Sequence, residues 1–260
     1  MIDPLMFIAL LPAVVLVVYI CRKDRTDKEP PALLVKLLGF GALSCLPAIV
    51  VELILSAVIE RLNVRSVYLG YFLEAFVVAG LTEETCKFLF LRTTWRNPAF
   101  DYQFDAIVYA VMVALGFAAF ENVKYVYSYG FATGIVRAVT AVPGHAIFGV
   151  FMGYFYGYAK LSDYWGRGED RKAYLALSVV VPVLLHGCYD FLAFAQESDS
   201  RFTLLFYAYL IALYVFGIRR VNRSARDDRR VTRETVFDYF RRMQYPMPPQ
   251  YRDRNDDFWR

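Results

Sequence analysis

Long apolar stretches, separated by short polar segments, run along the chain from its second residue to about residue 218. Each stretch is close to the ~17–25 residues that an α-helix needs to cross ~30 Å of hydrocarbon. We therefore predict an all-α fold, a polytopic transmembrane helical bundle of about seven spans. The predicted spans are Ile2 to Ile20, Ala32 to Ile59, Tyr71 to Arg92, Phe104 to Tyr127, Phe131 to Lys160, Ala173 to Ala195 and Phe202 to Ile218.

Composition supports a membrane environment for these helices. Hydrophobic residues make up 58% of the 260 residues, whereas soluble domains are nearer ~45–50% apolar. We predict a multi-pass protein of the cell membrane, with the lipid bilayer around it. The cysteines are spread over different spans or a predicted inner loop, which favours free thiols over disulfides or a metal knuckle. They are Cys21, Cys45, Cys86 and Cys188.

The two sets of loops between the predicted spans differ in basic residues. Cytoplasmic loops collect Lys and Arg, so the asymmetry predicts an N-terminus outside and a cytoplasmic C-terminus. The richer side carries Arg22, Lys23, Arg25, Lys28, Arg92, Arg96, Lys160, Arg167, Arg171, Lys172 and the segment from Arg219 onward, and the poorer side carries Arg61, Arg65 and Arg201.

Two parts of the chain follow from this pattern. Residues 1–218 are predicted to form a transmembrane helical domain with a catalytic core at about 71–195, and residues 219–260 a basic cytoplasmic tail. The tail contains Arg219, Arg220, Arg223, Arg226, Arg229, Arg230 and Arg233 ahead of a Pro-rich segment, Tyr245 to Gln250. We interpret it as a topology signal and weak anchor on anionic lipid. No nucleic-acid partner is expected.

Four carboxylates lie near the middle of predicted spans, where an unpaired charge costs ~2.5–3.5 kcal/mol. Together they would cost on the order of 10 kcal/mol without compensation, so they are expected to face the bundle interior. The two histidines of the chain lie at similar depth. These residues are Glu83, Glu84, Glu121, Asp190, His145 and His186.

Spacing relates the acids of the third span to a lysine. Glu83 and Lys87 are four residues apart on one helix face, and Glu84 is three residues from Lys87. Lys87 can therefore neutralise one carboxylate and leave the other as a base or ligand. The structural alternative is an internal salt bridge that only joins helices.

The sixth span pairs a histidine with an acid. His186 and Asp190 are four residues apart, so the carboxylate can orient the imidazole or help to hold a cation. A satisfied buried histidine is the alternative interpretation.

His145 follows Pro143 and Gly144, a pair that predicts a kink and a nearby cavity. A stripe of small residues continues the same helix face and predicts close packing with another helix. The stripe consists of Gly149, Gly153 and Gly157.

Glu121 stands beside Asn122 and three residues before Lys124. A structural pair between Glu121 and Lys124 is one interpretation, and a place in the site is the other. Polar residues nearer the span ends are explained by snorkelling and given no chemistry. They are Lys36, Glu52, Glu74, Asp105 and Arg137.

Carboxylates and imidazoles around water are typical of hydrolysis. In one version His145, His186 and Glu121 bind a metal such as Zn²⁺, and Glu83 or Glu84 is the general base. In the metal-free version a glutamate and a histidine activate water, and His186 or Asn122 stabilises the oxyanion. Other membrane-protease motifs, including His-Glu-x-x-His and Gly-x-Gly-Asp, are missing from the sequence.

Four segments lie on successive predicted spans: Glu83-Glu84-Thr85-Cys86-Lys87, Phe117 to Asn122, His145, and His186 to Asp190. In their order and placement they resemble the PrsW family of intramembrane proteases. That family is a branch of the group that contains the CAAX prenyl endopeptidases and bacteriocin-processing proteins. The resemblance implies a glutamate-dependent and metal-dependent peptidase, with Lys87 and Asp190 as further site residues. It also implies a membrane-anchored protein substrate such as an anti-sigma factor, cut on its extracytoplasmic side.

Two other functions use similar residues. Intramembrane acids and histidines also serve as proton relays in ion-coupled transporters, although no second set of acids suggests an inverted repeat. A scaffold that binds membrane partners through the same cavity is a third interpretation.

Overall fold

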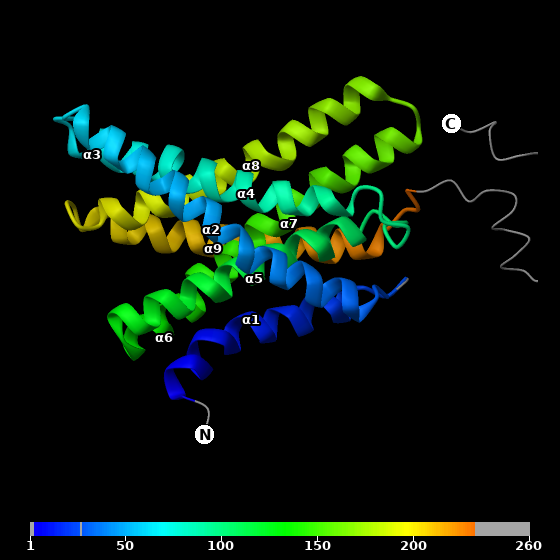
Figure 1. The fold of residues 1–260 in the computed structure, drawn as a ribbon, viewed down its shortest axis with the longest axis horizontal. Coiled ribbons are helices and arrows are strands. Elements are labelled where there is room, and N and C mark those ends of the chain that lie inside the picture. Colours follow the sequence, from blue (N-terminus) through cyan, green and yellow to red (C-terminus); the bar gives the residue numbers. More distant parts are fainter. Residues whose placement is uncertain (1–2, 27, 232–260) are drawn as a thin grey trace, which may run out of the picture.

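The computed structural model describes residues 3–26 and 28–231, and these residues are folded almost entirely as helices (Figure 1). The predicted tail beyond residue 231, including Arg233 and Tyr245 to Gln250, lies outside the described residues. The elements are α1 (Pro4–Lys23), α2 (Pro31–Arg61), α3 (Val67–Phe72), η1 (Leu73–Leu81), α4 (Thr82–Leu91), η2 (Arg92–Thr94), α5 (Asp105–Tyr129), α6 (Phe131–Val139), α7 (Ala141–Tyr164), α8 (Gly168–Ala195) and α9 (Arg201–Arg226).

Six helices of the described chain are long and apolar enough to cross a membrane, with Phe131–Tyr164 taken as one. The all-α, multi-pass prediction is confirmed. The predicted span Tyr71 to Arg92 is built from three consecutive segments, because the π-helix η1 lies between α3 and α4. The total of seven spans and the orientation of the termini stay predictions.

Helix α5 lies at the centre of the bundle, and most of its first four turns are buried. Glycines bring its neighbours close: a Cβ at Gly41 of α2 would meet the Val113 backbone, and a Cβ at Gly116 of α5 would meet the Leu38 backbone. The predicted stripe on α7 packs in the same way, since a Cβ at Gly149 would lie 3.0 Å from Ala110 O. Small residues therefore set the distances between α5 and its neighbours.

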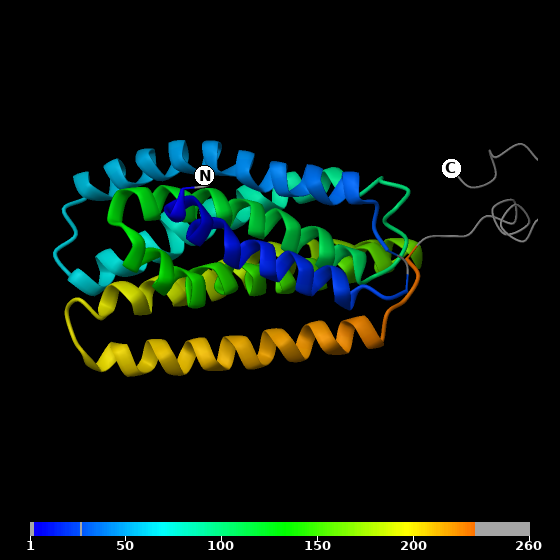
Figure 2. The same ribbon diagram turned by 90° about the horizontal axis from the view of Figure 1, so that it is seen from below.

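The outer surface and the helix ends fit a lipid environment. Large apolar side chains are exposed on the outer helices, with Leu204 of α9 76% exposed and Leu53 of α2 67% exposed. Figure 2 shows α2 and α9 on opposite sides of the bundle. The loops with most basic residues, α1–α2, α4–α5 and α7–α8, lie at the end of the bundle where α9 ends (Figure 1).

The break in the predicted fifth span lies at Thr140, where φ is −119° and ψ is −70°. The kink predicted at Pro143 and Gly144 is therefore wrong in position, because the observed break lies three residues before Pro143. Pro143 instead lies in the first turn of α7, where its missing N–H is not needed. Tyr214 of α9 donates its hydroxyl to Val139 O and Thr140 O, which satisfies carbonyls freed by the break.

Candidate active site

Four helices bring all of the predicted site residues to one region of the bundle. These residues form a connected network of hydrogen bonds and ion pairs. They are Glu83, Glu84 and Lys87 of α4, Glu121 of α5, His145 of α7, and His186 and Asp190 of α8. The predicted convergence of acids and imidazoles from separate spans is therefore present in the structure.

Lys87 occupies the middle of this network. Its Nζ donates to Glu83 Oε2 at 3.0 Å, to Glu84 Oε1 at 2.7 Å and to His145 Nδ1 at 3.2 Å. The ammonium also lies 4.0 Å from the ring centroid of Phe117, a cation–π contact. Lys87 is 1% exposed, so these contacts replace its hydration.

The two imidazoles share one pattern of contacts. His186 Nδ1 lies 3.0 Å from Glu84 Oε1, and its Nε2 lies 3.2 Å from Asp190 Oδ2. His145 likewise places Nδ1 toward Lys87 and Nε2 at 3.0 Å from Glu121 Oε2. Each ring thus presents Nδ1 to the cluster and is oriented by a carboxylate on Nε2.

Glu121 therefore lies behind His145, away from the Glu83 and Glu84 carboxylates. Its Oε2 also accepts from Arg137 of α6 at 2.7 Å. Among the described residues its ion pairs are to Arg137 and His145, so the suggested structural pair with Lys124 is replaced by contacts within the site.

The interpretation of Arg137 as a snorkelling residue is wrong, because its guanidinium pairs with Glu121. Gly130 at φ +87° ends α5 and begins α6, a conformation that glycine adopts without strain. The turn returns α6 along α5, so Arg137 reaches Glu121, which is 16 residues earlier. The available signal was a lone arginine in an apolar segment close to the break before α7.

Asn122 does not face the reacting region. Its Nδ2 donates to Ala9 O at 2.8 Å, its Oδ1 accepts from Arg137 Nε at 2.9 Å, and the residue is fully buried. The oxyanion role suggested for Asn122 is therefore incompatible with its contacts, which join α5 to α1 and α6.

A cavity of about 330 Å³ lies beside the cluster. Glu83 lines this cavity together with His145 and His186, whereas Glu84 does not. Besides Arg137, two acids that the sequence explains by snorkelling line the same cavity. They are Glu52 of α2 and Glu74 of η1.

The cluster fits a metal ion. Glu83, Glu84, His145 and His186 each offer a donor atom, and these atoms lie within 4.8 Å of one another. Glu84 Oε2 is buried without a hydrogen-bond partner, and carboxylates on the far ring nitrogens are typical of metal-binding histidines. Lys87 contacts three of the four donors, so a metal and the ammonium compete for them.

The chain is similar to one family of known proteins over most of its length. The model of the family described as PrsW family intramembrane metalloprotease matches residues 29–218. The chain is 35% identical to Protease PrsW of Oceanobacillus iheyensis over 82% of this chain and 92% of the relative. It is 33% identical to Protease PrsW of Bacillus subtilis over the same shares. For Protease PrsW of Clostridioides difficile the identity is 31%, over 87% of this chain and 94% of the relative.

No solved structure matches the chain. The relatives are proteases, and the transporter alternative receives no support from them.

Proposed function

Because the chain belongs to the PrsW family of intramembrane metalloproteases, we propose that its Glu/His cluster hydrolyses a peptide bond of a protein substrate within the membrane. The observation that carries this proposal is the gathering of Glu83, His145 and His186 on one intramembrane cavity. The protein is a multi-pass membrane protease, and the roles of individual residues are the proposed part.

Glu83 is the proposed general base. It lines the cavity, whereas its neighbour Glu84 is fully buried and holds Lys87 and His186. The Lys87 ammonium lies 3.0 Å from Glu83 Oε2, and the ionised carboxylate is the form that accepts a proton from water. Glu83 then returns this proton to the leaving amine.

Glu84, His145 and His186 are the proposed metal ligands. Two imidazoles and a carboxylate with an open position suit Zn²⁺, which when bound acidifies a water molecule and polarises a carbonyl. Glu121 and Asp190 orient the two rings through Nε2, a role distinct from the ligand role first suggested for Glu121. If the reaction uses no metal, His186 is the oxyanion donor, since Asn122 is engaged elsewhere.

The substrate class we propose is a membrane-anchored protein, with an anti-sigma factor as the example implied by the family resemblance. The cavity extends from the cluster past Ser56, Glu74 and Phe194. These residues lie toward the bundle end that holds few basic residues, which is predicted to be extracytoplasmic. This direction supports a cut near the outer face.

Cleavage of a membrane-anchored reporter in proteoliposomes tests the proposal. Glu83→Gln and His145→Ala are expected to lower the cleavage rate at least ~100-fold, because each removes a proton-transfer or ligand group. Glu60→Gln, an exposed glutamate at the end of α2, is the matched control and should cleave normally. Undiminished cleavage by well-expressed Glu83→Gln protein would refute the assignment.

Metal content separates the two versions of the mechanism. Elemental analysis of the purified protein should find a bound divalent ion, and His145→Ala and His186→Ala should each reduce it. Full activity after complete chelation would favour the metal-free version.

A further inference from the structure

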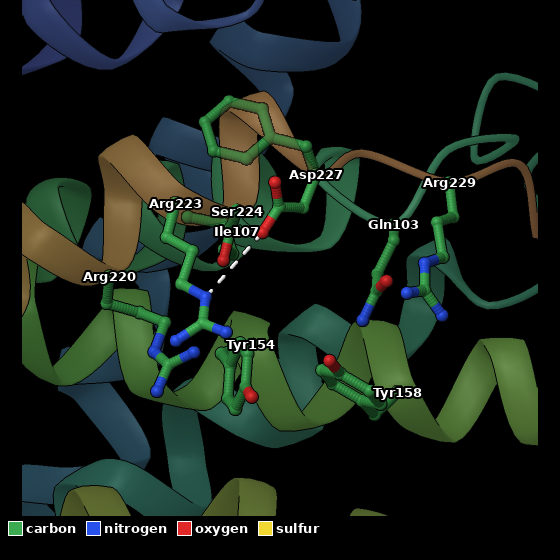
Figure 3. Close-up of a pocket in the computed structure, with 10 residues that line it drawn as sticks. Gln103, Ile107, Tyr154, Tyr158, Arg220, Arg223, Ser224, Asp227 and Arg229 are labelled. Carbon is green, nitrogen blue, oxygen red and sulfur yellow. Dashed lines mark ion pairs between the residues drawn. The ribbon is translucent and has the colours of Figure 1, made fainter.

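A second polar pocket lies at the opposite end of the molecule from the entrance of the active-site cavity. It has a volume of about 230 Å³ and lies between the start of α5, the last turns of α7 and the end of α9 (Figure 3). Its lining residues are Gln103, Phe104, Ile107, Tyr154, Tyr158, Arg220, Arg223, Ser224, Asp227 and Arg229.

The pocket is positively charged. Three arginines line it against one aspartate, and Figure 3 shows Arg220 and Arg223 beside Tyr154. The Arg220 guanidinium lies 3.9 Å from the Tyr154 ring centroid, which orients it over an aromatic face. Arg223 Nε lies 3.6 Å from Asp227 Oδ2, in an exposed ion pair that contributes little. Both guanidinium groups keep donors for an anion.

An apolar groove adjoins this pocket. It has a volume of about 440 Å³, lies between α7, α8 and α9, and is lined mainly by apolar side chains. Arg220 and Arg223 line both the groove and the pocket. The apolar residues of the groove are Phe151, Leu185, Ala212, Leu213 and Phe216.

We propose that this composite site binds one anionic phospholipid. The phosphate would contact Arg220 and Arg223, whose planar donor groups match phosphate oxygens, and an acyl chain would lie in the apolar groove. The uncharged run of α9 ends at Ile218, so the arginines lie where a headgroup meets hydrocarbon. The groove is the reason to assign the site to a lipid and not to free phosphate, which has no apolar part.

Native mass spectrometry of the full chain in detergent, with added phosphatidylglycerol or phosphatidylcholine, tests this site. We expect one retained phosphatidylglycerol and weaker binding of phosphatidylcholine. Arg220→Gln with Arg223→Gln should weaken phosphatidylglycerol binding on the order of tenfold. Arg226→Gln is the control for each of the two single variants, Arg220→Gln and Arg223→Gln: it removes one positive charge from the same helix end, is 76% exposed and lines neither cavity.

Two further arms identify the ligand. Ala212→Phe fills the groove without changing charge, so it should weaken phosphatidylglycerol binding while the protein keeps its melting temperature. Inorganic phosphate at millimolar concentration should compete poorly. Equal losses in Arg226→Gln and the two single variants, an unaffected Ala212→Phe, or effective competition by inorganic phosphate would each overturn the proposal.

Discussion

The same two helices, α5 and α7, meet in two different ways along their length. Toward the basic end, Gly153 of α7 is packed directly on the backbone of α5 at Ala106, with no space for a Cβ. Toward the other end, His145 and Glu121 face each other beside a cavity. The close-packed half sets the distance between the helices, so the polar half can stay open and still hold its side chains.

The largest effect is expected from removing the central cation of the polar half. Lys87→Met leaves Glu83 and Glu84 buried without their main partner, which should lower the free energy of unfolding by about 3–5 kcal/mol. Unfolding in detergent micelles measures this loss.

Two variants show whether that loss is electrostatic. Adding Glu83→Gln to Lys87→Met should recover part of the stability, since one unpaired carboxylate is removed. Lys36→Met, an exposed lysine on α2, should change little. A double variant as unstable as Lys87→Met would contradict the charge explanation.

The close-packed half should respond to a single methyl group. Gly153→Ala places a Cβ against the α5 backbone, and overpacking of this kind costs ~1–3 kcal/mol. Gly39→Ala in α2 is the matched control, because its Cβ would meet nothing within 4 Å. That variant should gain ~0.5–1 kcal/mol from helix propensity. Equal melting temperatures for the two variants would show that the contact between α5 and α7 is looser than described.

Arg137 tests how the polar half is held in place. Arg137→Gln removes the ion pair that orients Glu121 behind His145, and loss of such an outer contact typically lowers activity 10–100-fold. We expect kcat to fall while KM stays near the original value, with partial rescue by Arg137→Lys. A change in KM alone would place Arg137 in substrate binding instead.

A dependence of stability on pH is expected from an acid beside the close-packed half. Burial raises the pKa of Glu29, which lies before α2, from 4.5 to about 7, although a hydrogen bond from the Tyr109 hydroxyl at 2.6 Å opposes the shift. The folded protein therefore holds a proton that the unfolded chain releases between these pH values. The free energy of unfolding should fall as pH rises through this window.

Glu29→Gln should flatten that dependence, because the amide does not titrate and still accepts from Tyr109. Melting temperatures measured from pH 4.5 to 7.5 for the two proteins are the test. Parallel curves would show that Glu29 is not the titrating group.

Much of this arrangement could be predicted from the sequence. The length of an apolar run predicts a membrane-spanning helix, because in lipid the backbone N–H and C=O groups must be hydrogen-bonded within the segment. Charged side chains within such a run, for example Glu84, must then face the interior of the bundle. The four-residue spacing of His186 and Asp190 then corresponds to a direct contact in the structure.

Other features depend on how separate helices meet, and local spacing does not contain that information. Arg137 reaches Glu121 only because the chain turns at Gly130. Glu52 and Glu74 line the same cavity because α2 packs against η1. The contact of Asn122 with the carbonyl of Ala9 joins residues 113 positions apart in the chain, so local spacing does not predict it.

The π-helix η1 ends at Leu81, two residues before Glu83. A π-helical turn contains an extra residue relative to an α-helical turn, so a one-residue deletion there would convert it to regular α-helix. The deletion would be absorbed within that turn, whereas a one-residue deletion in the regular α-helix α4 would rotate one side of it by about 100° relative to the other. Within this span, η1 is therefore the segment whose length can change by one residue while Glu83 and Glu84 keep their places.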